Sequence, residues 1–257
     1  MNYQDFRKDN KNPGVGVLQK LLNANGALLD VDGEFGNETE KAVKSFQRLR
    51  RMTVDGIVGK ETWSRLAASE DLKIVDCVDV FDKSLSDLEA TDIANVGGHP
   101  LVIGGASNGV EAAVNMIVSS VQSGSVFLLR FHGHGAPGVA GISFGQGGVG
   151  FGERADIDTA DFEEVRPALA RLRSIFGPYG NVQFMHCETG SGAKGKALLR
   201  SVAETLGVPA TAAVHIQYGG GTYTFRFEGP THTEFPSGIS LRQWCMARPD
   251  FAGVCAA

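Results

Sequence analysis

The stretch at residues 181–190, NVQFMHCETG, decides how the larger part of this chain folds. Its apolar beginning predicts a buried strand, and a histidine, a cysteine and an acid follow where that strand ends: His186, Cys187 and Glu188. A second stretch, VFLLRFHGHGAPG at 126–138, has the same build, with histidines among glycines after an apolar strand. Because reactive groups of α/β proteins collect at the carboxyl ends of strands, Cys187 is the first candidate for chemistry.

From residue 74 onward, strand-like and helix-like segments alternate along the chain. This alternation predicts an α/β domain with a mainly parallel sheet and helices on both faces. If the strands that precede the two histidine-bearing ends are neighbours, His132, His134 and Cys187 converge at one edge, and the Gly-rich loop 138–154 covers that edge as a flap. We expect strands at 73–81, 101–105, 125–131 and 182–186, two more around a Gly-rich turn within 211–229, and helices at 110–121, 161–176 and 194–207.

The bulk composition excludes several classes of protein. The chain has 257 residues, of which 42% are hydrophobic and 21% charged, as in an ordinary soluble globular protein. A net charge of −5 without a basic cluster gives no reason to expect a nucleic-acid partner. No apolar run reaches the roughly 20 residues of a membrane span. The N-terminus lacks the apolar segment of a secretory signal, so we expect synthesis in the cytoplasm and export by a route that reads no cleavable signal.

Four cysteines are too few for a disulfide scaffold. Cys77 lies in an apolar strand and is expected to be a small buried hydrophobe. Cys245 and Cys255 either form a disulfide or remain two free thiols. Nothing in the sequence indicates a cofactor.

An internal repeat marks the N-terminal part as a separate module. DVDGEFGNET at 30–39 and TVDGIVGKET at 53–62 share D-G-x-x-G-x-E-T, with the second Asp 55 − 32 = 23 positions after the first. The Asp-Gly pair and the later glycine suit a tight turn, and Asn37 is expected to cap the helix that follows the first copy. Apolar residues at helical spacing before and between the copies predict three short helices joined by two similar turns.

Residues 12–68 resemble the three-helix peptidoglycan-binding domain of many cell-wall hydrolases. The resemblance implies attachment to peptidoglycan through its peptide stems. We therefore divide the chain into a peptidoglycan-binding domain at 1–68, a linker at 69–73 and an α/β domain at 74–257. The matching positions are the Leu18-Gln19 pair, the Asp32-Gly33-x-Phe35-Gly36 turn, the Phe46-Gln47 pair and the Val54-Asp55-Gly56-x-x-Gly59 turn.

The residues at the two strand ends suit two kinds of site. A histidine beside Cys187 can take the thiol proton and later protonate a leaving amine, while backbone N–H groups of Gly135 and the cysteine stabilise an oxyanion. Alternatively, His132 and His134 can bind zinc together with His186 or Cys187. The glycines around these histidines indicate a turn and no second closely spaced ligand pair exists, so the cysteine–histidine pair is preferred and no metal is expected.

The order of an apolar strand with His-Gly and an apolar strand with Cys resembles the caspase and gingipain clan of cysteine peptidases. More narrowly, HGAPG and the run CETGSGAKGKALLRSVAETLGVPATAAV are similar to an uncharacterised caspase-like domain of large bacterial surface proteins. The resemblance implies that Cys187 is the nucleophile and that His134 with Gly135 is the His-Gly pair. Gly133 stands where the family usually has Ser, and His186 stands where the family usually has Gly. The additional His186 either flanks the nucleophile or marks an altered or inactive site.

Three functions are compatible with these features. In the first, the N-terminal module holds the chain on peptidoglycan while Cys187 and His134 cleave an amide bond in its peptides. Such a lysin or secreted effector acts at the bacterial wall or periplasm and implies a secretion apparatus and a cognate immunity protein as further partners. In the second, a caspase-like protease cuts a protein at the wall. In the third, the chain is a catalytically inactive wall-binding adaptor.

His134 is the preferred general base among three histidines. It lies beyond the apolar strand and precedes Gly135, where a ring can reach over the sheet edge. His132 is nearer the strand body, and His186 is expected on the opposite face from Cys187 because side chains alternate along a strand. His132, His186 and Glu188 are therefore assigned auxiliary roles.

Overall fold

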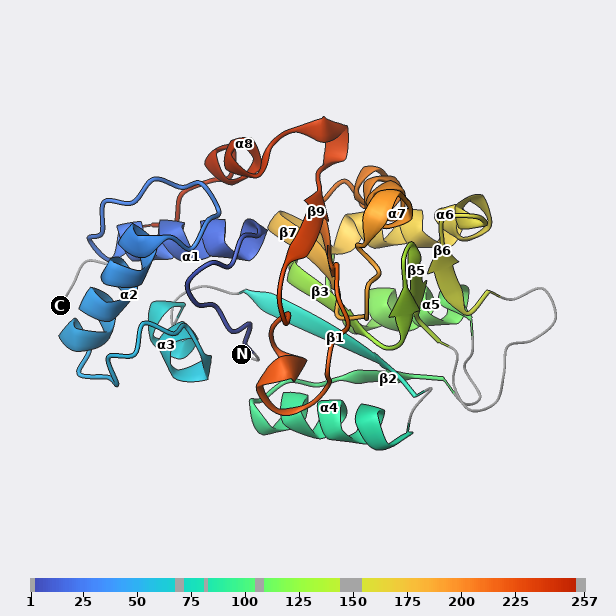
Figure 1. Cartoon of the computed structure of the whole chain (residues 1–257), viewed down its shortest axis with the longest axis horizontal. Coiled ribbons are helices and arrows are strands. Elements are labelled where there is room, and N and C mark those ends of the chain that lie inside the picture. Colours follow the sequence, from blue (N-terminus) through green and yellow to red (C-terminus); the bar gives the residue numbers. More distant parts are fainter. Residues whose placement is uncertain (1–2, 68–71, 81–82, 105–108, 144–153, 253–257) are drawn as a thin grey trace. The chain divides into compact units, whose positions relative to one another are not determined.

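The computed structural model describes residues 3–67, 72–80, 83–104, 109–143 and 154–252, which form two compact units (Figure 1). The α/β unit runs from Lys73 to Gly238. The helical unit runs from Tyr3 to Leu72 and resumes at Ile239. The sequence predicts an α/β domain that extends to residue 257. In the structure this unit ends at Gly238, because the helix that follows packs on the N-terminal part of the chain. Most of the expected linker at 69–73 lies outside the described residues.

The helical unit contains the three expected helices, α1 (Pro13–Ala24), α2 (Asn37–Leu49) and α3 (Lys60–Leu66). The side chain of Asn12 caps α1 by accepting from the backbone N of Val15 at 3.2 Å. The expected cap at Asn37 is wrong: this residue is the first of α2, and Gly36 precedes it as an N-cap without a side-chain bond.

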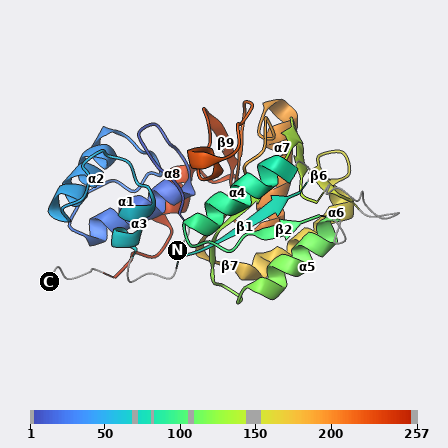
Figure 2. The same ribbon diagram turned by 90° about the horizontal axis from the view of Figure 1, so that it is seen from below.

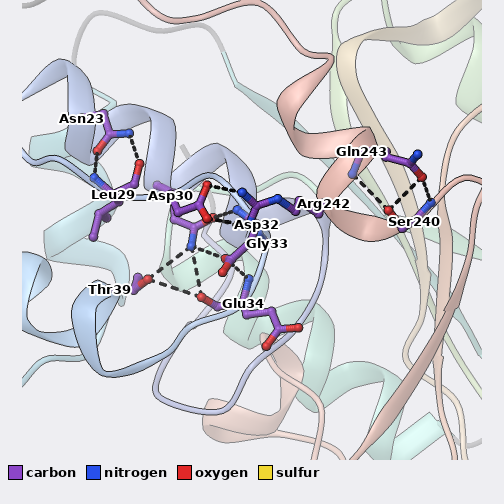
Figure 3. A network of polar contacts seen from close by, with 11 residues as sticks. Asn23, Leu29, Asp30, Asp32, Gly33, Glu34, Thr39, Ser240, Arg242 and Gln243 are labelled. Carbon is purple, nitrogen blue, oxygen red and sulfur yellow. Dashed lines mark hydrogen bonds and ion pairs between the residues drawn. The ribbon is translucent and has the colours of Figure 1, made fainter.

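One glutamine on the preceding helix organises each copy of the repeat. Gln19 of α1 donates to Asp32 Oδ1 at 2.7 Å and to the carbonyl of Glu34 at 3.1 Å, and accepts from Gly33 N at 2.9 Å. Figure 3 shows these turn residues gathered around the hydrogen-bond network. Gln47 of α2 makes the same three contacts at 2.8 to 2.9 Å in the second copy, with Asp55, Ile57 and Gly56. The repeat is therefore a turn clamped by one buried amide.

A fourth helix, α8 (Leu241–Met246), completes this unit by packing on α1. It begins with a capping box in which Ser240 and Gln243 satisfy each other's backbone N–H groups, as Figure 3 shows. The two terminal guanidinium nitrogens of Arg242 pair with Asp30, Nη2 at 2.9 Å. The possible partner of Cys245, Cys255, lies outside the described residues, so their pairing stays a prediction.

The α/β unit is built on a six-stranded sheet in the order β2-β1-β3-β7-β8-β9. All neighbouring pairs are parallel except β8 and β9, as the alternation of strands and helices predicts for most of the sheet. The strands are β1 (Lys73–Asp79), β2 (Leu101–Ile103), β3 (Val126–His132), β7 (Phe176–Phe184), β8 (Ala210–Ala213) and β9 (Thr231–Glu234).

Helices cover both faces of this sheet, as expected. Crossovers between parallel strands are right-handed, so α4, which leads away from β1 toward β2, lies on the opposite face from the helices of the later crossovers. Figure 2 shows α4 and α5 on opposite sides of the sheet. The helices are α4 (Lys83–Asn95), α5 (Val110–Ser120), α6 (Phe162–Ala170) and α7 (Gly192–Leu206). The main apolar core lies between the sheet and α5, α6 and α7.

Two segments differ from the sequence-based expectation. The expected helix 161–176 ends at Ala170 and continues as a 3-10 helix, η1 (Arg171–Ile175). Within 211–229 only β8 is a strand; the rest is a loop with one 3-10 turn, η2 (Gly221–Thr224), and β9 follows it. This loop is held by Asp92, whose Oδ2 accepts from Gly221 N and Thr224 Oγ1, so it pairs with α4 instead of forming a hairpin.

The expected flap at 138–154 is only partly described. Its beginning forms β5 (Val139–Gly141), which pairs antiparallel with β4 (Gly135–Ala136) and β6 (Asp156–Asp158) in a small second sheet. Residues 144–153 lie outside the described residues, so a flap there stays a prediction.

We expect Gly16→Ala to destabilise the helical unit, although alanine normally stabilises a helix interior. A Cβ at Gly16 would lie 2.3 Å from Cys245 Sγ and 2.8 Å from Cys245 Cβ, so α1 and α8 would be forced apart. The free energy of unfolding should fall by about 1–3 kcal/mol, the usual cost of overpacking. Urea unfolding followed by tryptophan fluorescence measures it, because both tryptophans of the chain, Trp63 and Trp244, belong to this unit.

The double variant Gly16→Ala/Cys245→Gly is the matched control, since it removes both clashing atoms. We expect Gly16→Ala to cost much less stability when it is added to Cys245→Gly than when it is added to the parent protein. A Gly16→Ala protein at least as stable as the parent contradicts the packing of α8 on α1.

Candidate active site

The two histidine-bearing strand ends lie side by side. β3 and β7 are adjacent parallel strands at the middle of the sheet, with Phe131 opposite Phe184 (Figure 1). One residue further on, Met185 N donates to the carbonyl of Phe131 at 2.8 Å. Parallel pairing in this register brings the segments after His132 and after Met185 to the same edge of the sheet.

The closest approach between the two segments is at Gly135. A Cβ on this residue would lie 2.9 Å from the carbonyl oxygen of Cys187, 2.7 Å from His186 Cβ and 2.3 Å from Thr189 Oγ1. No larger residue fits there without moving backbone, so the glycine after His134 allows the chain to pack directly against the residues around Cys187.

Cys187 is half-buried, and its thiol lies against the loop between β8 and β9. The backbone N–H of Gln217 donates to Sγ at 3.3 Å, and the thiol lies 3.4 Å from the carbonyl oxygen of the same residue. The other two described cysteines are buried: burial raises the pKa of the Cys77 thiol and raises that of Cys245 to about 12. Cys187 is thus the most accessible of the three thiols.

The chain turns sharply just after Cys187. Glu188 has a φ of +53°, in the left-handed region that a residue with a Cβ seldom occupies. Its backbone N donates to the carbonyl of His215 at 3.0 Å, and its carbonyl accepts from Ser191 N at 2.7 Å. These bonds hold the strained turn and lead the chain from the sheet edge into α7. Such outliers are found at functional sites more often than elsewhere.

His186 is fully buried and neutral. Its Nε2 donates to the carbonyl oxygen of Gly141 at 2.7 Å, and its ring lies 5.9 Å from that of Phe184, on the face of β7 that packs against α5, α6 and α7. Burial, together with the charge of nearby His132, lowers the pKa of His186 to about 4, although the hydrogen bond to Gly141 acts in the opposite direction. The ring therefore ties the small second sheet to the main one, on the side of the strand away from Gln217.

His132 belongs to a buried cluster of charges on the α4 face of the sheet, formed by Asp76, Glu89, Arg130 and His132. Its Nε2 lies 3.1 Å from Asp76 Oδ1, and its Nδ1 lies 3.7 Å from Glu89 Oε1. Burial alone would lower the pKa of His132, but the two carboxylates outweigh it and raise this pKa to about 9. At neutral pH the ring is thus a cation held by two acids.

Arg130 supplies the second cation of this cluster. Its Nη2 donates to Asp76 Oδ2 at 3.0 Å, and its guanidinium lies 5.5 Å from the centre of the Phe225 ring. Burial alone would raise the pKa of Asp76, but Arg130 and His132 hold it well below its usual range. The cluster therefore connects β1, β3 and α4 with the loop that carries Gln217.

His134 is exposed on the turn between β3 and β4, and its carbonyl accepts from Gly141 N at 2.9 Å. Of the three histidines assigned from the sequence, it is the one whose ring is not enclosed. Among the described residues, no three His, Cys, Asp or Glu side chains gather in a way that would hold a metal ion.

Sequence reasoning missed Gln217 and the acids of the buried cluster. Asp76 lies within the apolar strand KIVDCVDVF, and Arg130 lies within VFLLRFH. Charged residues in buried strands are almost always paired, so this pattern could have predicted that the two form an ion pair. Glu89 and Gln217 carry no such signal, because their positions follow from the packing of α4 and of an irregular loop.

A comparison with known families matches the N-terminal part of the chain. Residues 11–66 match the family described as a putative peptidoglycan binding domain, so the chain carries an N-terminal peptidoglycan-binding domain. Among solved structures, a peptidoglycan-binding protein from Clostridioides difficile in complex with glutamine hydroxamate is 36% identical over 24% of this chain and 40% of that one, with a TM-score of 0.24. A Burkholderia AP3 phage endolysin is 29% identical over 48% of this chain and 40% of that one, with a TM-score of 0.26.

This chain spans about two fifths of the length of either structure. No helix among the residues described here is long and apolar enough to cross a membrane.

We expect the stability of the α/β unit to fall at both ends of the pH range. The pKa of His132 is raised from its usual 6.5 to about 9, so its contribution is complete below pH 6.5 and is lost as pH rises through 9. The pKa of His186 is lowered from 6.5 to about 4, so its neutral form stabilises the fold above pH 6.5 and that contribution is lost as pH falls toward 4. Each histidine changes the unfolding constant by up to about tenfold per pH unit.

Urea unfolding followed by circular dichroism measures this dependence, with the tryptophan signal identifying the transition of the helical unit. His132→Gln should remove the dependence between pH 7 and 9 and leave a smaller loss on the acid side, because the charge of His132 no longer lowers the pKa of His186. The same alkaline slope in the variant and the parent would show that His132 does not carry the effect.

Proposed function

We propose that this chain is a wall-attached cysteine hydrolase that cleaves an amide bond in peptidoglycan peptides, with Cys187 as nucleophile and His134 as general base. The observation that carries the proposal is the close approach of Gly135 to the backbone of Cys187. His134 directly precedes Gly135 in the sequence and therefore lies beside the segment that contains the nucleophile. The two motifs resemble those of caspase-like peptidases, and this resemblance likewise implies that the strand end with His134 lies next to the strand end with Cys187.

The surroundings of the other histidines support the choice of His134. A general base must be accessible to the thiol and to substrate. His132 is a buried cation between two carboxylates, and the ring of His186 is fully buried on the face of β7 away from Gln217. His134 is exposed on the turn beside Cys187 and meets the requirement for access to substrate.

In the proposed reaction, His134 takes the proton of the Cys187 thiol, and the thiolate attacks the carbonyl carbon of the scissile amide. The N–H groups of Gly135 and Cys187 stabilise the resulting oxyanion. His134 then gives its proton to the leaving amine, and the C–N bond breaks to leave a thioester on Cys187. A water molecule, deprotonated by His134, hydrolyses the thioester and restores the thiol.

The substrate class follows from the N-terminal domain. A peptidoglycan-binding domain on the same chain raises the effective concentration of the catalytic domain at the wall, which favours a substrate located there. A protein substrate at the wall is the alternative, and muropeptide analysis of digested sacculi distinguishes the two.

One observation favours a non-enzymatic adaptor instead. The Cys187 thiol already contacts both backbone groups of Gln217, and Gly133 and His186 depart from the pattern of the resembled family. In the hydrolase, the Gln217 contact must yield to substrate. In an adaptor, it would keep the thiol unreactive.

We expect Cys187→Ala to abolish the release of new amine ends from purified sacculi by the full-length protein. The reason is the loss of the only atom that can form the thioester. Cys245→Ala, which removes a buried thiol of the helical unit, is the matched control and should retain activity. Equal release by Cys187→Ala and the parent protein would rule out Cys187 as nucleophile.

We expect His134→Ala to lower this activity by about 10²-fold or more, the usual cost of losing a general base. His186→Gln preserves a donor toward the carbonyl of Gly141 and should lose clearly less. Labelling by iodoacetamide provides a second readout: Cys187 should react faster than Cys77 and Cys245 in the folded protein, and more slowly in His134→Ala. Labelling of Cys187 no faster than Cys77 would favour the adaptor.

A further inference from the structure

The two copies of the repeat differ in one loop. From the clamping glutamine to the turn aspartate there are 32 − 19 = 13 positions in the first copy and 55 − 47 = 8 in the second. The first copy therefore has 13 − 8 = 5 additional residues between glutamine and turn. Three of them extend α1 beyond its glutamine, since 24 − 19 = 5 and 49 − 47 = 2, and the other two lengthen the loop after α1. Both turns are clamped in the same way, so the clamp does not require the longer loop.

This loop has a fixed conformation. Asn23 closes it with two hydrogen bonds to the backbone of Leu29, donating to its carbonyl at 2.9 Å and accepting from its N at 2.8 Å, as Figure 3 shows. At the other end, Asn25 donates to the carbonyl of Leu21 at 2.9 Å and accepts from Arg50, the residue after α2, at 3.2 Å. A surface held in one shape in advance binds a ligand with little loss of conformational entropy.

The loop exposes an apolar side chain beside a groove. Leu28 at its tip is fully exposed (101%), and Leu49 across the groove is 69% exposed. Between them the loop and α2 enclose a groove of about 420 Å³, whose lining includes Leu22, Ala42 and Phe46. A fixed loop that keeps a leucine entirely in water gains nothing for folding from that side chain, whereas apolar surface beside a groove is typical of a binding site.

Opposite charges border the groove on α2. Lys41 Nζ pairs with Glu38 Oε1 at 2.7 Å, and both side chains are exposed and line the groove. In solvent this pair contributes little to stability, so either group is available to a ligand. The groove thus offers an apolar centre, one cation and one anion.

We propose that this groove, between the loop 25–29 and α2, binds the stem peptide of peptidoglycan. The inference rests on the wall attachment of the proposed function but not on the hydrolase activity. A stem peptide carries alanine methyl groups for the apolar centre, a carboxylate for Lys41 and, at its diamino acid, an amine for Glu38.

The lining favours the peptide over the glycan strand. Sugar rings usually stack on exposed aromatic faces. Phe46 is the one aromatic residue among those the structure places along the groove, and it is only 5% exposed with Arg50 over its ring. Small aliphatic groups next to a charged pair suit a short peptide better.

Co-sedimentation with sacculi tests this assignment in the full chain carrying Cys187→Ala, so that binding is measured without hydrolysis. We expect Leu28→Ser and Leu49→Ser each to weaken binding at least fivefold, and Lys41→Gln to weaken it less. Val54→Ser is the matched control, because Val54 is 42% exposed in the same unit but outside the groove. Tryptophan fluorescence during urea unfolding checks that each variant is folded.

A second arm uses glycan strands from which an amidase has removed the stem peptides. Loss of binding to these strands, together with the effects of Leu28→Ser and Leu49→Ser, supports the proposal. Equal binding of stripped glycan, or full binding by both groove variants, overturns it while leaving wall attachment intact. If the parent chain fails to bind sacculi at all, wall attachment itself fails, and the groove assignment with it.

Discussion

The candidate site depends on the fully buried ion pair between Asp76 of β1 and Arg130 of β3. Two charges taken out of water stabilise a fold only when each is satisfied, and loss of one partner from such a pair usually costs about 3–5 kcal/mol. Here the pair also holds His132, through Asp76 Oδ1, and the loop of Gln217, through the Phe225 ring over Arg130. The strand end and the loop beside Cys187 are thus positioned by the same two charges.

This arrangement separates the chemistry of three histidines that lie close together. His132 keeps its proton because two carboxylates surround it, and His186 stays neutral because it is buried and lies near the charge of His132, although its hydrogen bond to the carbonyl of Gly141 acts in the opposite direction. Neither change needs a difference in residue type; the environment alone decides it. The third histidine, His134, is exposed, whereas the other two are buried.

Local sequence patterns predicted helices and strands, but they did not predict which segments distant in the sequence pack together. The helices of the repeat follow from apolar residues at helical spacing, and the meeting of the two strand ends follows from alternating strands and helices with short connections. The second strand expected within 211–229 did not form, because Asp92 of α4 binds that loop from far away in the sequence. The sequence also placed α8 with the α/β domain, since a helix of six residues carries too little pattern to name its partner.

The partner of α8 is nevertheless encoded by a difference between the two repeat copies. Gly16 and Lys44 both stand three positions before the clamping glutamine, since 19 − 16 = 47 − 44 = 3. In the second copy the stem of Lys44 covers the turn, with its Cε 2.7 Å from where a Cβ of Gly56 would lie. In the first copy a glycine leaves this place open, and Cys245 of α8 occupies it. A lysine at position 16 would fill the space that Cys245 needs, so this glycine determines that a helix from a distant part of the chain completes the peptidoglycan-binding unit.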